Sequence, residues 1–262
     1  MGQDLVVKLF GVLDKVKWPT DGSASTQGHS AYLIGLEQLD EYKGDPKSLT
    51  ATLRTFLSGQ SAPYAYAGAA SILITAAREK DGSYAENGLE AAMIYLEKAQ
   101  ETAQDVVEIN VTEAYIYIYY GRFDDARLVL DYLHDQDIGN FYVNRAEVPF
   151  WQRQGNLEET VHWTEQAIRA ADVIPKKLRL KWQLGDLYLE HGMMDEALAV
   201  FKEAVHFDRE NVALWHKMAM IYVKQGNLEE AYRVNQQSLR IKEYPAGRKL
   251  EEALKEHMSN NE

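Results

Sequence analysis

Two copies of one 34-residue unit, at residues 178–211 and 212–245, constrain the fold of this chain more than any other feature. Tyr188 and Gly192 of the first copy recur as Tyr222 and Gly226 of the second. Small residues also return to matching positions, which are Gly185, Ala197 and Ala204 in the first copy and Ala219, Ala231 and Ser238 in the second. A period of this length, with small and aromatic residues in fixed places, predicts helix–turn–helix units stacked side by side.

The same 34-residue repeat pattern extends toward the N-terminus. Gly121 and Gly155 are also 34 residues apart, and the hexapeptide at residues 154–159 is repeated letter for letter at residues 225–230. The pattern resembles the tetratricopeptide repeat (TPR) family, whose units carry an aromatic residue, Leu-Gly, Tyr, Gly, Ala, an aromatic residue and Ala along 34 positions. The resemblance implies an all-α fold, a right-handed superhelix of helix–turn–helix TPR units with a C-terminal capping helix.

The pattern divides the chain into an N-terminal segment, five repeat units and a capping helix. Residues 1–60 are expected to be irregular and helical, with one amphipathic helix at 3–17, a flexible loop at 18–27 and a helix pair at 29–42 and 46–58 that could be a degenerate repeat. The five units are expected over residues 61–246, at about 61–106, 107–140, 141–177, 178–211 and 212–245. The capping helix and tail cover residues 247–262.

Two stretches test this interpretation. Residues 115–120, Tyr-Ile-Tyr-Ile-Tyr-Tyr, have the intrinsic preference of a β-strand. The repeat register nevertheless places them on the first helix of a unit, and we expect stacking to override the local preference. In the capping helix, the spacing predicts an apolar edge formed by Leu250, Ala253, Leu254 and His257, with Glu251 facing water.

Composition narrows the classes of function. The chain has 262 residues, no cysteine and a net charge of −12, and residues 61–140 alone hold 14 acidic side chains against five basic ones. A strongly acidic surface keeps a repeat protein soluble and disfavours binding of nucleic acid. The apolar run at residues 5–13 is too short to cross a bilayer, and no secretory leader is recognisable, so we expect a cytoplasmic protein without membrane insertion.

No pattern indicates chemistry. None of the seven histidines has another histidine three or four residues away, so no helix presents two imidazoles on one face. No phosphate-binding GxxxxGK[S/T] segment and no GxSxG elbow occurs. The sequence therefore predicts a protein that is not an enzyme and uses no cofactor or metal.

The resemblance also implies a binding surface. In TPR proteins the first helix of each unit lines a concave groove, and ligand contacts come from positions 2, 5, 6, 9, 12 and 13 of the unit. Carried over to this chain, the peptide-binding residues are Tyr115, Tyr119, Tyr142, Arg145, Arg153, Arg179, Trp182, Gln183, His216, Lys217 and Met220. The excess of basic residues at these positions predicts a partner segment with acidic and apolar side chains.

The function that follows is an interaction scaffold or assembly adaptor that holds another protein in its groove. One alternative is a self-associating structural protein, a homo-oligomer whose N-terminal helical arm docks into the groove of a neighbouring copy. A second alternative is a regulatory module that senses a small peptide. The identity of the partner, the pathway and the oligomeric state are not encoded in any pattern found here.

Overall fold

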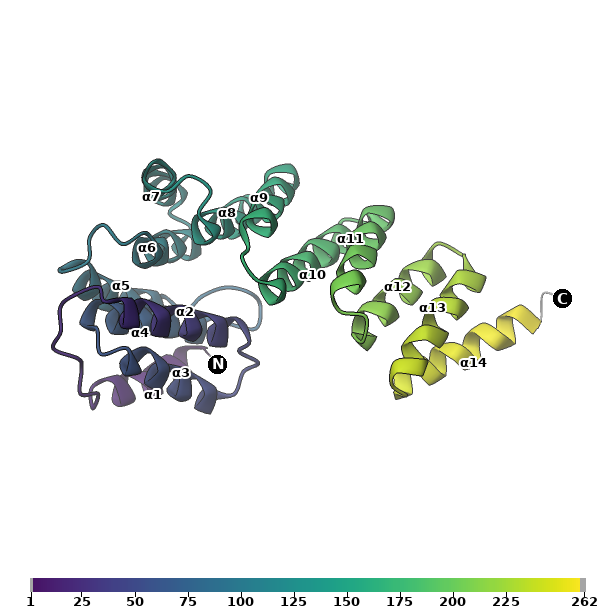
Figure 1. Cartoon of the computed structure of the whole chain (residues 1–262), viewed down its shortest axis with the longest axis horizontal. Coiled ribbons are helices and arrows are strands. Elements are labelled where there is room, and N and C mark those ends of the chain that lie inside the picture. Colours follow the sequence, from purple (N-terminus) through teal and green to yellow (C-terminus); the bar gives the residue numbers. More distant parts are fainter. Residues whose placement is uncertain (1, 260–262) are drawn as a thin grey trace. The chain divides into compact units, whose positions relative to one another are not determined.

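The computed structural model describes residues 2–259, and within that range the chain is helical apart from turns and one isolated β-bridge between Arg78 and Tyr84. Fourteen helices are present in the described residues (Figure 1): α1 Gly2–Leu13, α2 Thr26–Asp40, α3 Pro46–Ser58, α4 Ala62–Ala77, α5 Glu86–Gln100, α6 Val107–Tyr120, α7 Phe123–Gln136, α8 Phe141–Arg153, α9 Leu157–Ala170, α10 Ile174–Glu190, α11 Met194–Phe207, α12 Val212–Lys224, α13 Leu228–Ile241 and α14 Pro245–Ser259. The predicted all-α fold class, built of packed helix pairs, is confirmed.

The chain divides into two compact units, residues 1–163 and 164–262, and α9 begins in the first unit and ends in the second. In the first unit, α2 packs on α3, α4 on α5 and α6 on α7, and each pair also contacts the next. In the second unit, α10 packs on α11, α12 on α13, and α14 covers α13. Within each unit, neighbouring helix pairs therefore bury the apolar faces that a single pair would leave in water.

Glycines end the first helix of four successive pairs. Gly121, Gly155, Gly192 and Gly226 all have a positive φ, between 73° and 78°. Glycine adopts this left-handed conformation without a Cβ clash, so it lets the chain turn at once into the second helix. The predicted helix at residues 115–120 is also confirmed, because α6 runs through the whole tyrosine-rich segment before ending at Gly121.

Glycine also sets the distance between paired helices. A Cβ built on Gly185 of α10 would lie 2.4 Å from the Phe201 ring of α11. In the first unit the ring of Phe56 on α3 fills the same role between two glycines, since a Cβ on Gly35 or Gly68 would lie 2.2 or 2.3 Å from it. The helix pair predicted at 29–42 and 46–58 is therefore present as α2 and α3. Its contact between a phenylalanine ring and a glycine is of the same kind as the contact between α10 and α11.

The N-terminal helix belongs to the core of the first unit. Val6, Leu9 and Leu13 of α1 are at most 3% exposed and lie in the same apolar cluster as the facing sides of α4 and α5. Gly2 and Val6 pack closely on Ala77 and Gly88, the residues at the ends of those two helices. The apolar face of α1 is thus covered by its own chain.

The segment after α1 is held in place, which corrects the expectation of a flexible loop at 18–27. The indole of Trp18 stacks on the rings of Tyr66 and Tyr95, with centroid distances of 4.7 and 5.4 Å. The Asp21 carbonyl accepts a hydrogen bond from the Ala62 amide at 2.7 Å, and the Ser23 carbonyl accepts one from the Ser61 hydroxyl at 2.7 Å. The turn-forming composition predicted the absence of a helix, but not these long-range contacts.

The capping helix α14 buries a different edge from the one predicted. Leu254 is buried and Leu250 is half-buried against α13, whereas Ala253 and His257 are exposed. Glu251 is only 6% exposed, and it accepts hydrogen bonds from Lys255 at 2.6 Å, Arg248 at 2.8 Å and Gln236 at 2.8 Å. These donors lower the pKa of Glu251 to about 2, so the carboxylate stays charged while covered.

Candidate functional site

The predicted binding positions lie on α6 and α8 in the first unit and on α10 and α12 in the second. In the first unit, they meet side chains from distant parts of the same chain. The ring of Tyr84, from the enlarged turn between α4 and α5, stacks on Tyr119 at 4.0 Å with 10° between the planes. Tyr115 stacks on Tyr119 in turn, at 5.9 Å. The aromatic stripe of α6 is therefore covered along part of its length.

Arg153 closes this stack from α8. Its guanidinium lies over the rings of Tyr84 and Tyr119, 5.3 and 5.1 Å from their centroids, and donates a hydrogen bond to the Gly82 carbonyl at 2.9 Å. A cation on an aromatic face is attracted by the negative face of the ring. Tyr84, Tyr119 and Arg153 thus form one cluster that ties the enlarged turn to α6 and α8.

Arg145, also on α8, pairs with Asp40 at the C-terminal end of α2. Both terminal nitrogens donate to the carboxylate, one of them at 2.9 Å. Burial lowers the pKa of Arg145, but the neighbouring Tyr115 and Asp40 raise it more, so the guanidinium stays charged. This fork geometry is the strong form of an arginine–carboxylate contact. The positive charge predicted for the groove at Arg145 is therefore balanced within the chain.

Helix α2 also covers the beginning of α6. The Tyr32 hydroxyl donates to the Glu108 carbonyl and shares a hydrogen bond with the Thr112 hydroxyl, both at 3.2 Å. Burial raises the pKa of Tyr32 and of Tyr115 to about 12, which keeps both phenols neutral. Tyr142 of α8 is half-buried with its ring edge-on to Phe141 at 5.0 Å. In the first unit, the predicted surface is largely an internal seam.

In the second unit, α10 and α12 bring an aromatic ring and a charge pair together. The Lys217 ammonium of α12 pairs with Asp186 of α10 and lies 5.4 Å from the centroid of the Trp182 ring. Both Lys217 and Trp182 remain partly accessible. Gln183 of α10 and Met220 of α12 are exposed, and Arg179 is half-buried. This half of the predicted set is accessible on two helices linked by the Lys217–Asp186 contact.

His216 has a structural contact in the same unit. Its Nδ1 shares a hydrogen bond with the Tyr244 hydroxyl at 2.9 Å, and that hydroxyl also bonds the Ser238 hydroxyl at 2.9 Å. Burial lowers the pKa of His216, which favours the neutral ring at neutral pH. His216 therefore connects α12 to α13 and to the residue just before α14.

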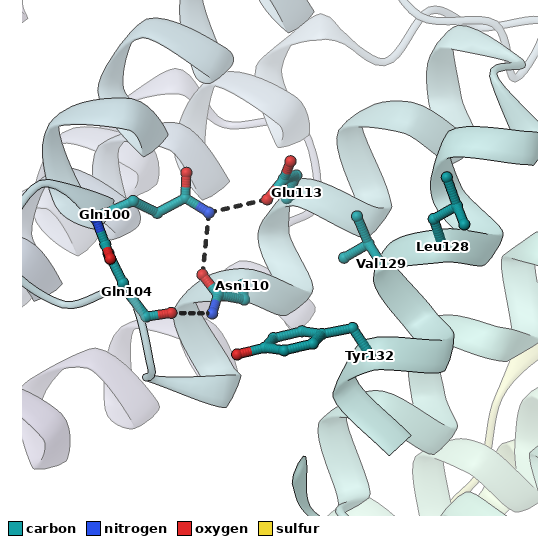
Figure 2. A pocket seen from close by; sticks show the side chains of 7 residues that line it. All are labelled: Gln100, Gln104, Asn110, Glu113, Leu128, Val129 and Tyr132. Atoms are coloured by element: carbon teal, nitrogen blue, oxygen red, sulfur yellow. Dashed lines mark hydrogen bonds between the residues drawn. The ribbon is translucent and has the colours of Figure 1, made fainter. Parts of the chain in front are cut away.

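A cleft of about 450 Å³ lies between α5, α6 and α7 of the first unit, away from the predicted positions. Figure 2 shows Gln100 and Gln104 on one side, Asn110 and Glu113 at the centre, and Leu128, Val129 and Tyr132 on α7. The Gln100 amide donates to Asn110 Oδ1 at 3.0 Å and to Glu113 Oε2 at 2.9 Å, and the Asn110 amide donates to the Gln104 carbonyl at 2.6 Å. The sequence hinted at this place only through the acidic excess of residues 61–140.

The described residues, 2–259, hold neither a cluster of metal ligands nor a helix that could span a membrane. No group of three or more His, Asp or Glu side chains in that range is placed to hold a metal ion. No helix in the same range combines the length and the apolar character that crossing a bilayer requires.

Comparison with known sequences identifies a repeat family in the C-terminal part of the chain. A family model described as tetratricopeptide repeat matches residues 188–254, from the end of α10 into α14. Residues 188–254 of this chain are therefore tetratricopeptide repeat sequence. No curated protein matches this chain.

Solved structures resemble this chain in fold. PilF of Pseudomonas aeruginosa aligns with a TM-score of 0.52 and 15% identity over 90% of this chain and 86% of its own. The Cut9–Hcn1 hetero-tetramer of the APC/C aligns with a TM-score of 0.54 and 12% identity over 97% of this chain and 46% of its own. YrrB, described as a TPR protein with an unusual peptide-binding site, aligns with a TM-score of 0.43 and 16% identity over 65% of this chain and 85% of its own. Such identities show likeness of fold alone.

Proposed function

We propose that this TPR protein is a non-enzymatic scaffold that binds a segment of another protein on the first helices of its repeats. TPR units generally serve as protein–protein interaction scaffolds. The observation that carries the proposal is the accessible surface of α10 and α12, where Trp182, Lys217 and Asp186 meet. Aromatic and cationic side chains held in a preformed arrangement are typical anchors of an interface, because little order is lost on binding.

The pairing of the cations refines the expected partner. Lys217 is paired with Asp186 and Arg145 with Asp40, so an acidic partner segment would have to compete with a carboxylate of the chain itself. The competition is easier at Lys217, because the Asp186 side chain is 42% exposed and the Asp40 side chain only 15%. We therefore assign first contact with an acidic and apolar segment to α10 and α12.

The test is selection of peptides from a random library on the immobilised full chain, followed by affinity measurements with variants. Lys217→Glu should abolish binding of acidic, apolar peptides, whereas Asp186→Asn should tighten it by removing the internal competitor. Lys202→Glu on α11 is the matched control for a change of two charge units. The proposal fails if Lys217→Glu and Lys202→Glu bind equally well, or if Asp186→Asn weakens binding as much as Lys217→Glu does.

The alternative of self-association through the N-terminal arm has less support. That arm would need a free apolar face on α1, and Val6, Leu9 and Leu13 are already buried against α4 and α5. Binding of a neighbouring copy through α1 would first require this helix to leave its own core.

A further inference from the structure

A second surface of the first unit has the features of a docking site, and it is separate from the positions on α10 and α12. On α7, Leu128 is 70% exposed and Tyr132 is 46% exposed. Single exposed apolar side chains are common and need no explanation. These two, however, are one helical turn apart and line the cleft between α5, α6 and α7, with the half-buried Val129 beside them.

The charges in the segment that lines the cleft are mostly negative. Residues 97–135 carry nine acidic side chains and three basic ones. The three cations are already engaged: Arg122 with Asp125, Arg127 with Glu147, and Lys98 over the rings of Tyr66 and Tyr95. Within residues 2–259, none of the exposed carboxylates Glu97, Glu101, Asp105, Asp124 and Asp135 forms an ion pair. The segment that supplies the lining of the cleft therefore carries an excess of unpaired negative charge.

A carboxylate also lies inside the cleft. Glu113 lines it and is held by the hydrogen bond from Gln100, which is itself bonded to Asn110 (Figure 2). No lysine or arginine of the described residues pairs with Glu113. A carboxylate held in place beside exposed apolar side chains suits a partner segment in which a lysine or arginine lies next to an apolar residue.

We propose that the cleft between α5, α6 and α7 is a second docking surface, and that its occupant is a basic amphipathic segment of a partner protein. Glu113 would accept hydrogen bonds from a lysine or arginine of that segment. Leu128 and Tyr132 would bury its neighbouring apolar side chain. Nucleic acid and anionic lipid are excluded by the sign of the charge, because both would be repelled by the rim.

The experiment measures fluorescence anisotropy of a labelled twelve-residue peptide with lysines on both sides of a central Leu-Leu pair, mixed with the full chain at about 0.15 M salt. We expect saturable binding that weakens at least tenfold when the peptide leucines become serine, and that disappears when its lysines become glutamate. The pair Glu113→Gln with Leu128→Ser should weaken binding about tenfold. Gln104→Lys, a change at an exposed position of the rim, should weaken it similarly without touching the helix cores.

Two controls make the outcome decisive. The matched pair Glu196→Gln with Phe207→Ser changes an exposed carboxylate and an exposed apolar side chain on α11, and it should leave the affinity unchanged. Lys217→Glu should also leave it unchanged, which separates this site from the one on α10 and α12. The proposal is overturned if the peptide does not bind, if the serine peptide binds as tightly as the leucine peptide, or if the cleft variants bind within twofold of the unmodified chain.

Discussion

The contact between Gly185 and Phe201 allows the packing of a repeat to be tested with a single methyl group. A Cβ at residue 185 would lie 2.4, 2.5 and 3.0 Å from three carbons of the Phe201 ring, where the usual separation is about 3.5–4.0 Å. The ring is fully buried, so it cannot turn out to solvent. Either the ring or α10 must therefore move by about 1 Å.

Gly185→Ala should consequently destabilise the second unit. Over-packing of this kind costs about 1–3 kcal/mol, and the better helix propensity of alanine offsets about 1 kcal/mol of that loss. The net expectation is a loss of up to about 2 kcal/mol in the free energy of unfolding. Gly11→Ala in α1 is the matched control, because nothing lies within 4 Å of its Cβ position. There the same change should stabilise by about 0.5–1 kcal/mol.

Urea unfolding monitored by circular dichroism gives the stability of each variant. Because repeat units can unfold in separate steps, hydrogen exchange of the α10 and α11 amides should assign the loss to the second unit. A cycle with Phe201→Leu adds a second check, since the double variant should lose less than the sum of the two single losses. The reasoning is refuted if Gly185→Ala is as stable as the unmodified chain, or if both glycine substitutions change stability in the same direction.

Three further predictions follow from the first unit. Glu147 is fully buried and hydrogen-bonded to Arg127 and His134, so Glu147→Gln should cost about 2–3 kcal/mol in urea unfolding. Burial raises the pKa of Glu147, but the hydrogen bonds from His134 and Arg127 lower it by more, so the pKa lies below its usual value. The stability that ionised Glu147 adds is therefore present at pH values above its usual pKa and is lost as the pH falls through its pKa in the folded chain. This explanation is contradicted if the stability of Glu147→Gln depends on acid pH in the same way as that of the unmodified chain. Burial raises the pKa of Tyr32 and Tyr115 from 10.0 to about 12, so the free energy of unfolding should fall as the pH rises between those two values. Urea unfolding at a series of pH values should show a smaller fall for Tyr115→Phe, and an equal fall would contradict this. Trp18→Ala removes the stacking that holds the segment after α1, so trypsin should cut faster after Lys17, as followed by mass spectrometry, and an unchanged rate would argue against the stacking.

Much of the fold follows from spacing along the chain. The glycines that end the first helices and the small residue at each helix crossing repeat at fixed intervals, so they were recognisable without coordinates. The tyrosine-rich segment before Gly121 shows that this register is a stronger signal than local preference. A helix in a stack is stabilised by its neighbours, and that stabilisation outweighs the small intrinsic preference of each residue.

The weaker parts of the prediction all depend on partners far away in the sequence. Residues 18–27 look like a free loop because nothing local reveals that Trp18 stacks on Tyr66 and Tyr95. The edge of α14 was misassigned because Glu251 is buried by three hydrogen-bond donors, not by its own hydropathy. The cleft on α7 was missed because exposed leucine and scattered acids are ordinary when seen one at a time.

The sequence by itself determined that this protein is a stack of helix pairs, since periodicity is a local property that each repeat carries in its own residues. Only the tertiary structure decided which charges meet. Arg145 and Asp40 are 105 residues apart, and Lys217 and Asp186 lie on different repeats, yet each pair neutralises a cation that the sequence presented as available to a partner. The physical reason is that an ion pair depends on distance in space, which the spacing of residues along a chain does not specify.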